Sequence, residues 1–251
     1  QRFPHASRGA LREQRTGEGI LDQWIAARTQ ELINDVTEFL DSYDTVHSTR
    51  SIESYISDLS TWYLRRSRGR TDLGFFETLN SCLVAVSKVA APFMPYISEE
   101  IFRNLSPTLS LSRRGEGEVQ SVHLSDWPKS KKLTVDQEKL LKGMNEIRKV
   151  VEEVHAKRAK AGIKLRQPLA RLTLPVSSAR NLTLFPSPKS ERAGGEVTDV
   201  AELSNILKDE VNVLEIQLGD KLELDTKITP DLKLAGLARE LERQIQQLRK
   251  E

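Results

Sequence analysis

The sequence has few of the residues that build self-contained chemical sites. Cys82 is the single cysteine, which excludes a disulfide framework and a cysteine-paired zinc site. The four histidines (His5, His47, His123 and His155) are scattered, and none has a partner at catalytic or metal-ligand spacing. A glycine-rich phosphate loop is also missing. We therefore expect no catalytic residue and no metal site in this chain.

Aromatic residues and long apolar runs are scarce as well. Aromatics make up 6% of the sequence and apolar residues 38%, and no segment approaches the roughly 18 uninterrupted apolar residues of a membrane span. We expect a helix-rich protein without a membrane partner. Because the sequence has no targeting segment and no cysteine pair, the expected location is the reducing cytoplasm. The chain begins with Gln1 rather than Met, and we expect it to be a piece of a longer protein.

The net charge of +2 says little about partners, but the charges are unevenly distributed. Between Lys129 and Arg171 there are thirteen Lys or Arg residues against five Asp or Glu residues. A local excess of positive charge of this kind is typical of a surface that contacts a polyanion.

Apolar residues recur at helical spacing through the first hundred residues. Stripes run over residues 21–43, 52–63 and 75–90, and a shorter one runs over 97–105. Four such helices joined by short connections predict a bundle over residues 18–105, with Trp62 in its core. Residues 1–17 are expected to form an irregular lead-in, and residues 106–133 a long polar loop.

The pattern changes in the second half of the chain. A capping box of Thr134 and Gln137 opens a long connecting helix over residues 134–163, which Gly162 ends. Strand-like alternation follows at 168–176, 211–218 and 222–228, and Thr229-Pro230 opens a last helix. Residues 164–251 therefore predict a small α/β C-terminal domain, which we expect to be incomplete. The predicted fold class is mainly α: a helical bundle followed by this small α/β domain.

Residues 58–70 form the first candidate binding segment. Arg65, Arg66, Arg68 and Arg70 fall within six residues at the end of a helix, beside two aromatic residues. Guanidinium groups in such a place can contact phosphates and stack on the bases of unpaired RNA. The alternative is that they only offset the negative end of the helix dipole. The residues alone leave both possibilities open.

Residues 157–169 form the second candidate segment. Lys157 and Arg158 end the basic helix, and Lys164 and Arg166 follow in an extended stretch, so that the four together could clamp an RNA backbone. The alternative is an ordinary solvated charged face.

Several motifs in these segments resemble one protein family. The opening Leu21-Asp22-Gln23-Trp24-Ile25, residues 58–68 and residues 91–101 are similar to the anticodon-binding helical domain of class I aminoacyl-tRNA synthetases for isoleucine, valine and leucine. Residues 121–128, 162–169 and 207–213 resemble the isoleucyl-tRNA synthetases in particular. Residues 229–240 resemble their last domain, in the form without a C-terminal zinc cluster. The resemblance covers roughly residues 20–251.

The resemblance implies that the chain is an anticodon-binding helical bundle with its C-terminal continuation. Its partners would be the anticodon stem and loop of the isoleucine-accepting tRNA and the upstream catalytic and editing domains of the same enzyme. The family's two ATP-holding signatures, similar to His-Ile-Gly-His and Lys-Met-Ser-Lys-Ser, do not occur in the sequence. ATP and Mg2+ would therefore belong to the parent enzyme, and this chain alone is expected to be inactive.

The sequence departs from the family pattern at three places. Gly69 interrupts the basic run, residues 1–17 do not match the family, and residues 181–195 are less similar to it than the rest. Two alternatives stay open at this point. One is the same region of a valyl- or leucyl-tRNA synthetase, and the other is a non-catalytic helical module that binds proteins.

Overall fold

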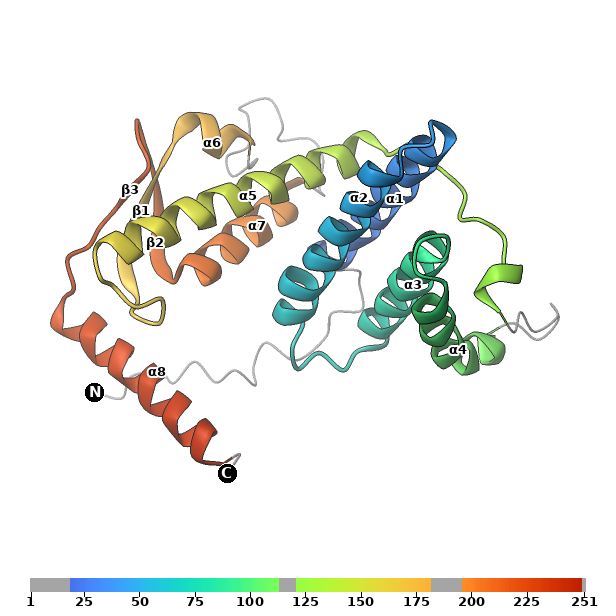
Figure 1. The fold of residues 1–251 in the computed structure, drawn as a ribbon. Helices are drawn as coiled ribbons and strands as arrows, with labels where there is room; N and C mark the ends of the chain where they lie inside the picture. The colour runs from blue at the N-terminus through green and yellow to red at the C-terminus, as the bar shows by residue number, and fades with distance from the viewer. Residues whose placement is uncertain (1–18, 113–120, 182–195, 250–251) are drawn as a thin grey trace. The chain divides into compact units, whose positions relative to one another are not determined.

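Helices make up most of the chain in the computed structural model, which describes residues 19–112, 121–181 and 196–249 (Figure 1). They fall into two compact units, residues 1–138 and residues 139–251. The predicted lead-in at 1–17, part of the predicted loop (113–120) and nearly all of the atypical stretch 181–195 lie outside the described residues.

The first unit contains the predicted helical bundle. Its α-helices are α1 (Ile20–Asp41), α2 (Thr45–Ser57), α3 (Leu73–Ala90) and α4 (Pro95–Ser112). The chain passes from α2 directly into a π-helix, η1 (Asp58–Leu64). Asp44 and Asp72 open α2 and α3, where their side chains accept hydrogen bonds from the otherwise unpaired amides of His47 and Phe75. Figure 1 shows α1 beside α2 and α3 beside α4.

The core of this unit is built mainly from the predicted stripes. The most deeply buried large side chains are Trp24, Ile25, Leu32, Val36, Tyr55, Tyr63 and Val89. Each contributes about 1.5–3 kcal/mol relative to an exposed position. Trp62, predicted in the core, is only half-buried.

Three apolar residues of the predicted stripes in this unit are exposed instead. Ile56, in α2, is 43% exposed. Tyr43 is 92% exposed because it occupies the turn after α1 with a φ of 59°. Ile97 is 56% exposed because the buried side of α4 runs through Ser98 and Phe102. All three predictions are wrong.

The predicted polar loop at 106–133 is partly regular. Helix α4 continues to Ser112, consistent with the apolar spacing of Phe102, Leu105 and Leu109, and a 3-10 turn, η2, covers Val122–Leu124. The segment after η2 is bonded to α1: Trp127 Nε1 donates to Thr37 Oγ1 at 2.9 Å. The prediction of a continuous loop is therefore wrong, since serine-rich composition does not by itself end a helix.

The second unit holds a three-stranded sheet in the order β2-β1-β3. Its strands are β1 (Leu169–Pro175), β2 (Val213–Gly219) and β3 (Glu223–Leu224). Strands β1 and β2 are parallel, and β1 and β3 are antiparallel. Parallel neighbours require a crossover connection, and α6 (Val176–Asn181) and α7 (Glu196–Val211) lie between β1 and β2 in the chain. Neither helix is predicted from the sequence, and β3 is much shorter than the predicted strand at 222–228.

The predicted long helix is α5 (Val135–Lys160), and Gly162 follows it with a φ of 66°. The boundary between the units falls in its first turn. Rather than acting as a connector, α5 belongs to the second unit, where it buries Met144, Ile147 and Val154. The sheet contributes Leu169, Leu172 and Leu174 to the buried residues of the same unit.

The last helix, α8 (Pro230–Leu248), begins at the predicted Thr229 cap, whose side chain accepts a hydrogen bond from the Leu232 amide. Its predicted apolar stripe is exposed along its whole length. The stripe comprises Leu234, Leu237, Leu241, Ile245 and Leu248.

Helix α3 has the length and mean hydropathy of a membrane span, by composition alone. A core helix of a bundle satisfies the same criterion. Phe75, Val86 and Val89 of α3 are buried in the first unit, and Glu77 and Lys88 place charges along the helix. We therefore describe α3 as a bundle helix.

Candidate nucleic-acid interface

The first group of candidate arginines lies on a basic turn, residues 65–70, directly after η1. Single π turns inside helices are frequent near functional sites. Arg65 and Arg68 are exposed, and Arg66 is half-buried. The guanidinium carbon of Arg65 lies 5.9 Å from the centre of the Trp62 ring, within the range of a cation–π contact. The turn therefore presents two exposed guanidinium groups, of which that of Arg65 lies beside an indole ring.

Arg70 faces the protein. Its Nη1 and Nη2 donate to the two carboxylate oxygens of Asp22 at 2.7 and 2.8 Å. Its Nε and Nη2 also donate to Asp72 at 2.9 and 2.8 Å. The hydrogen bonds to Asp72 and then those to Asp22 raise the pKa of Arg70, and Arg70 in turn lowers the pKa of Asp72. The geometry does not favour the predicted RNA contact by Arg70, because the guanidinium is already bonded to two carboxylates.

Arg158 is fully buried, at 0% exposure. Its guanidinium donates to the carbonyls of Lys164, Gln167, Val211 and Asn212 at 2.7–3.3 Å. Burial lowers its pKa. A side chain without accessible surface cannot reach a phosphate, so the prediction that Arg158 contacts RNA is wrong. The error has a physical reason: position 158 continues the buried side of α5, four residues after Val154.

The other three candidates of the second segment lie at or near the surface of the second unit. Lys164 is exposed, and Arg166, with its side chain 55% exposed, forms an ion pair with Glu240 at 3.5 Å. Lys157 is half-buried and forms an ion pair with Glu153 at 3.5 Å. Lys164 and Arg166 thus share one loop, while the basic turn belongs to the first unit.

The carboxylates that hold the basic turn and η1 are not among the residues predicted from the sequence. Asp58, in η1, accepts a hydrogen bond from Arg28 Nε at 3.0 Å, and the two side chains are 4% and 11% exposed. Asp22 is 2% exposed in the first turn of α1. An Asp or Arg inside an apolar stripe is the signal that could have identified them, because a buried charge requires a partner. Asp72 could have been found as the N-cap of α3.

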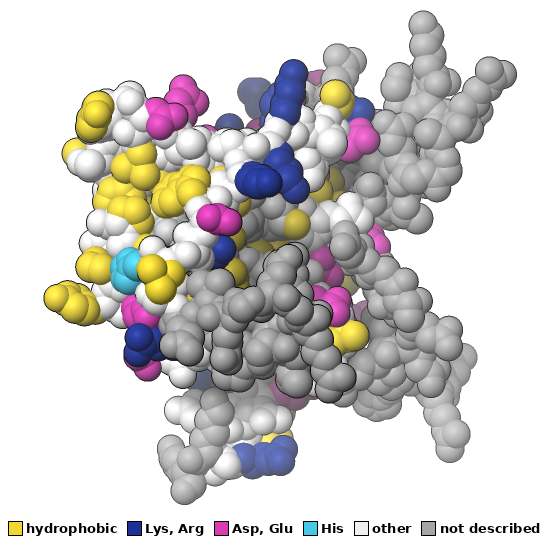
Figure 2. All heavy atoms as spheres, turned by 90° about the vertical axis from the view of Figure 1, so that its right-hand side faces the viewer, with side chains coloured by type: hydrophobic (Ala, Val, Ile, Leu, Met, Phe, Trp, Pro, Cys, Tyr) yellow, Lys and Arg dark blue, Asp and Glu magenta, His cyan; other side chains and the backbone are white. Residues whose placement is uncertain are grey.

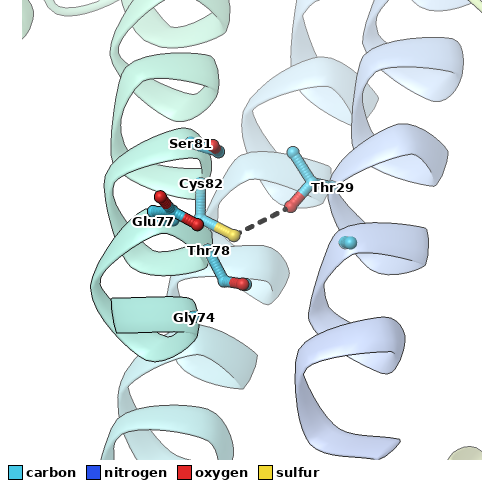
Figure 3. A pocket seen from close by; sticks show the side chains of 7 residues that line it. Thr29, Gly74, Glu77, Thr78, Ser81 and Cys82 are labelled. Carbon is cyan, nitrogen blue, oxygen red and sulfur yellow. Dashed lines mark hydrogen bonds between the residues drawn. The ribbon is translucent and has the colours of Figure 1, made fainter. Parts of the chain in front are cut away.

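A pocket of about 320 Å3 lies between α1 and α3 (Figure 3). Thr29 of α1 faces α3, and its Oγ1 lies 3.4 Å from Cys82 Sγ. The labelled α3 residues that line the pocket are Gly74, Glu77, Thr78, Ser81 and Cys82. Burial raises the pKa of the Cys82 thiol, which disfavours the reactive thiolate. The lining therefore does not form a nucleophilic site.

Metal-ligand geometry is likewise absent from the part of the chain that the structure describes: no three His, Cys, Asp or Glu side chains there are grouped to hold an ion.

The surface also carries apolar side chains. Met94, Tyr96, Ile97 and Leu124 are 40–91% exposed around the α3–α4 turn and η2. On the face drawn in Figure 2, hydrophobic side chains gather in one region, and Lys and Arg side chains are scattered around it.

Comparison with known proteins identifies the family of this chain. A family model described as the anticodon-binding domain of tRNA ligase matches residues 22–174, a range that includes the basic turn and the Lys164–Arg166 loop. An isoleucine–tRNA ligase of Dehalococcoides mccartyi (strain CBDB1) is 32% identical over 241 residues, covering 92% of this chain and 23% of the relative. The isoleucine–tRNA ligase of Thermus thermophilus is 34% identical over 228 residues, covering 86% of this chain and 20% of the relative. That of Deinococcus radiodurans is 38% identical over 169 residues, covering 64% and 15%.

The chain spans about a fifth of the length of the curated relatives it matches. The family model covers more than half of the chain, and the relatives named above share one activity in their names. The chain therefore belongs to the anticodon-binding domain family of tRNA ligases, in a form similar to that of isoleucine–tRNA ligases.

Proposed function

We propose that this chain binds the anticodon stem-loop of an isoleucine tRNA on behalf of a larger isoleucine–tRNA ligase. The observation that supports the proposal is the basic turn at a helix end, which exposes Arg65 and Arg68 and places Arg65 beside Trp62. Contacts to phosphates position an RNA and supply much of the affinity, whereas contacts to bases supply discrimination. Unpaired loop bases are the part of an RNA that proteins read most readily, by stacking and by hydrogen bonds to their edges.

The side chains divide these roles in the proposal. Arg68, and Arg66 beside it, contact phosphates, and Arg65 with Trp62 offers a planar surface on which a base can stack. Lys164 and Arg166 form a second phosphate contact on the other unit. Arg166 is bonded to Glu240 at 3.5 Å on a solvent-exposed side, and a pair of that kind is weak enough to be exchanged for a phosphate.

The chemistry of the larger protein is assigned elsewhere. Neither ATP-holding signature occurs in this sequence, and no described cluster is arranged to hold a metal. In the proposal, ATP, Mg2+ and isoleucine are therefore bound by a part of the ligase that this chain does not include. The location of the enzyme is the cytoplasm, where tRNA is charged.

The test is binding to three short RNA hairpins, measured by filter retention at several salt concentrations. They are the anticodon stem-loop with an isoleucine anticodon, the same hairpin with a valine anticodon, and an acceptor-stem hairpin. We expect the tightest binding to the isoleucine hairpin and a marked loss of affinity with salt. Equal binding to all three hairpins would contradict the proposal, and preference for the valine anticodon would assign the chain to the sibling enzyme.

One observation favours a second candidate function, protein docking. Leu73 and Phe76 of α3 are 71% and 52% exposed, and together they form an apolar face. If docking were the only function, the chain would bind none of the hairpins. Changing the arginines of the basic turn would then leave the binding of a partner protein unchanged.

A further inference from the structure

A buried carboxylate lies beneath the basic turn. Asp22, 2% exposed, accepts hydrogen bonds from the Tyr63 hydroxyl at 2.7 Å and from both terminal nitrogens of Arg70 at 2.7 and 2.8 Å. The Gly19 amide donates to the same carboxylate at 3.1 Å. Four hydrogen bonds from three segments of the chain therefore meet on one side chain.

Arg70 extends this network to the next helix. It donates twice to Asp72, whose Oδ1 also accepts the Phe75 amide at 2.9 Å and so caps α3. The guanidinium carbon lies 5.3 Å from the centre of the Phe75 ring. A guanidinium has five N–H groups, and the four hydrogen bonds to the two carboxylates leave at most one of them for a ligand.

The network holds both ends of the turn. Tyr63 precedes Arg65 by two residues and Arg70 follows Arg68 by two, and both donate to Asp22. The backbone adds hydrogen bonds from the Ser67 amide to the Tyr63 carbonyl and from the Arg70 amide to the Ser67 carbonyl. Residues 63–70, which carry the exposed arginines, are therefore held at both ends by hydrogen bonds to the buried Asp22 carboxylate.

We propose that Asp22 is a positioning residue for RNA binding, and that Arg70 acts with it rather than on a phosphate. Through Tyr63 and Arg70, Asp22 fixes the backbone from which Arg65 and Arg68 reach the RNA. A preorganised loop binds more tightly because its ordering cost is met during folding and not during binding. This inference rests on the proposed function.

A purely electrostatic role and a positioning role of Asp22 predict opposite changes in RNA affinity when its carboxylate is neutralised. The substitution Asp22→Asn removes a negative charge beneath a surface that binds a polyanion, so Coulomb attraction alone would strengthen binding. Loss of the anchor would weaken it instead, because the turn must then be ordered by the RNA. We expect a loss of about tenfold, the factor for ordering one backbone residue on binding.

The matched control is Asp41→Asn, which removes the same charge from the exposed last residue of α1. It should leave affinity for the isoleucine anticodon hairpin unchanged or slightly higher. Both variants are measured at a temperature where circular dichroism shows them fully folded. Binding by Asp22→Asn that equals or exceeds wild type would overturn the proposal.

Arg70→Lys supplies an independent readout on a side chain that is 28% exposed, and it decides the question if Asp22→Asn does not fold. Lysine keeps the charge but cannot donate to both carboxylates with the fork geometry of a guanidinium. If Arg70 contacted a phosphate directly, Arg70→Lys would retain both the affinity for the hairpin and the slope of log affinity against log salt. A positioning role predicts weaker binding with the slope retained, because the phosphate-contacting arginines remain.

Failure of this inference differs from failure of the proposed function. If wild type binds the hairpin and both Asp22→Asn and Arg70→Lys bind equally well, only the positioning role is refuted. If wild type binds no hairpin, the proposed function is refuted and the positioning role with it.

Discussion

Replacing Arg158 by Met should destabilise the second unit selectively. Arg158 is fully buried and donates to four carbonyls with no carboxylate partner among the described residues. Two of the carbonyls have a second donor: Lys164 accepts the Gln167 amide, and Asn212 accepts the Leu169 amide. Within the described residues, the carbonyls of Gln167 and Val211 accept hydrogen bonds from Arg158 and from no second donor.

The magnitude follows from those two carbonyls. A buried acceptor that loses its partner costs about 1–3 kcal/mol, so the pair costs about 2–6 kcal/mol. Met retains most of the packing of the Arg stem and removes the cost of burying a charge, which offsets part of the loss. Exchanges of buried ionic groups for apolar ones are often neutral when all partners are exchanged, but backbone carbonyls cannot be removed by mutation. We expect a net destabilisation of about 3 kcal/mol.

The assay uses the uneven distribution of tryptophan. Trp24, Trp62 and Trp127 all lie in the first unit, so tryptophan fluorescence reports on that unit alone. Amide hydrogen exchange of peptides covering residues 163–176 and 207–219 reports on the second unit. Arg158→Met should accelerate exchange in these peptides and leave the fluorescence-detected urea midpoint unchanged. Unchanged exchange, or slower exchange, would refute the reasoning.

Three smaller predictions concern other contacts. Arg70 holds the pKa of Asp72 below its ordinary value of 3.8. Their interaction therefore stabilises the fold above about pH 4 and is lost as the pH falls below that value. In urea unfolding, the stability difference between wild type and Asp72→Asn should narrow from pH 5 to about pH 2, and a constant difference would contradict this. Because burial raises the pKa of Cys82, the thiol should resist alkylation in the folded chain at neutral pH and react in denaturant; rapid labelling of the folded chain would show that the bundle opens. Thr134→Ala removes one side of the capping box with Gln137 and should cost about 1 kcal/mol, seen as faster amide exchange in the first turn of α5, whereas Thr49→Ala in the middle of α2 should not change that turn.

The helices of the first unit follow from apolar spacing because each buries a continuous stripe. Trp24, Ile25, Leu32 and Val36 repeat at helical spacing and are all buried. The π-helix could not be predicted, because apolar spacing does not show where the hydrogen-bond register of a helix shifts. Asp58, the first residue of η1, pairs with Arg28, which lies 30 positions earlier in the chain. The same holds for α7, whose place between two parallel strands depends on a pairing between residues far apart in the sequence.

The candidate interface could be predicted only in part from the sequence. The sequence identifies clusters of basic residues but does not tell which of them face the solvent. Arg68 and Arg158 are both arginines in basic runs, yet one is exposed and the other is 0% exposed. Helical periodicity carries part of the missing information, since position 158 continues the stripe of Val151 and Val154. Arg70 could not be assigned in this way, because its partner Asp22 lies 48 positions away in the chain.

In the proposed function, the arginines of a preordered turn contact a folded RNA, chiefly through its phosphates. The most direct test of this proposal is the slope of log affinity against log salt for the isoleucine anticodon hairpin, compared between wild type and Arg65→Gln/Arg66→Gln/Arg68→Gln. Each phosphate contact contributes about 0.7–0.9 to that slope, so the triple variant should bind more weakly with a slope shallower by about 2. A charge-matched variant, Arg50→Gln/Arg103→Gln/Lys233→Gln, changes exposed cations of α2, α4 and α8 and should retain the slope. Parallel lines for wild type and the basic-turn variant would contradict the account.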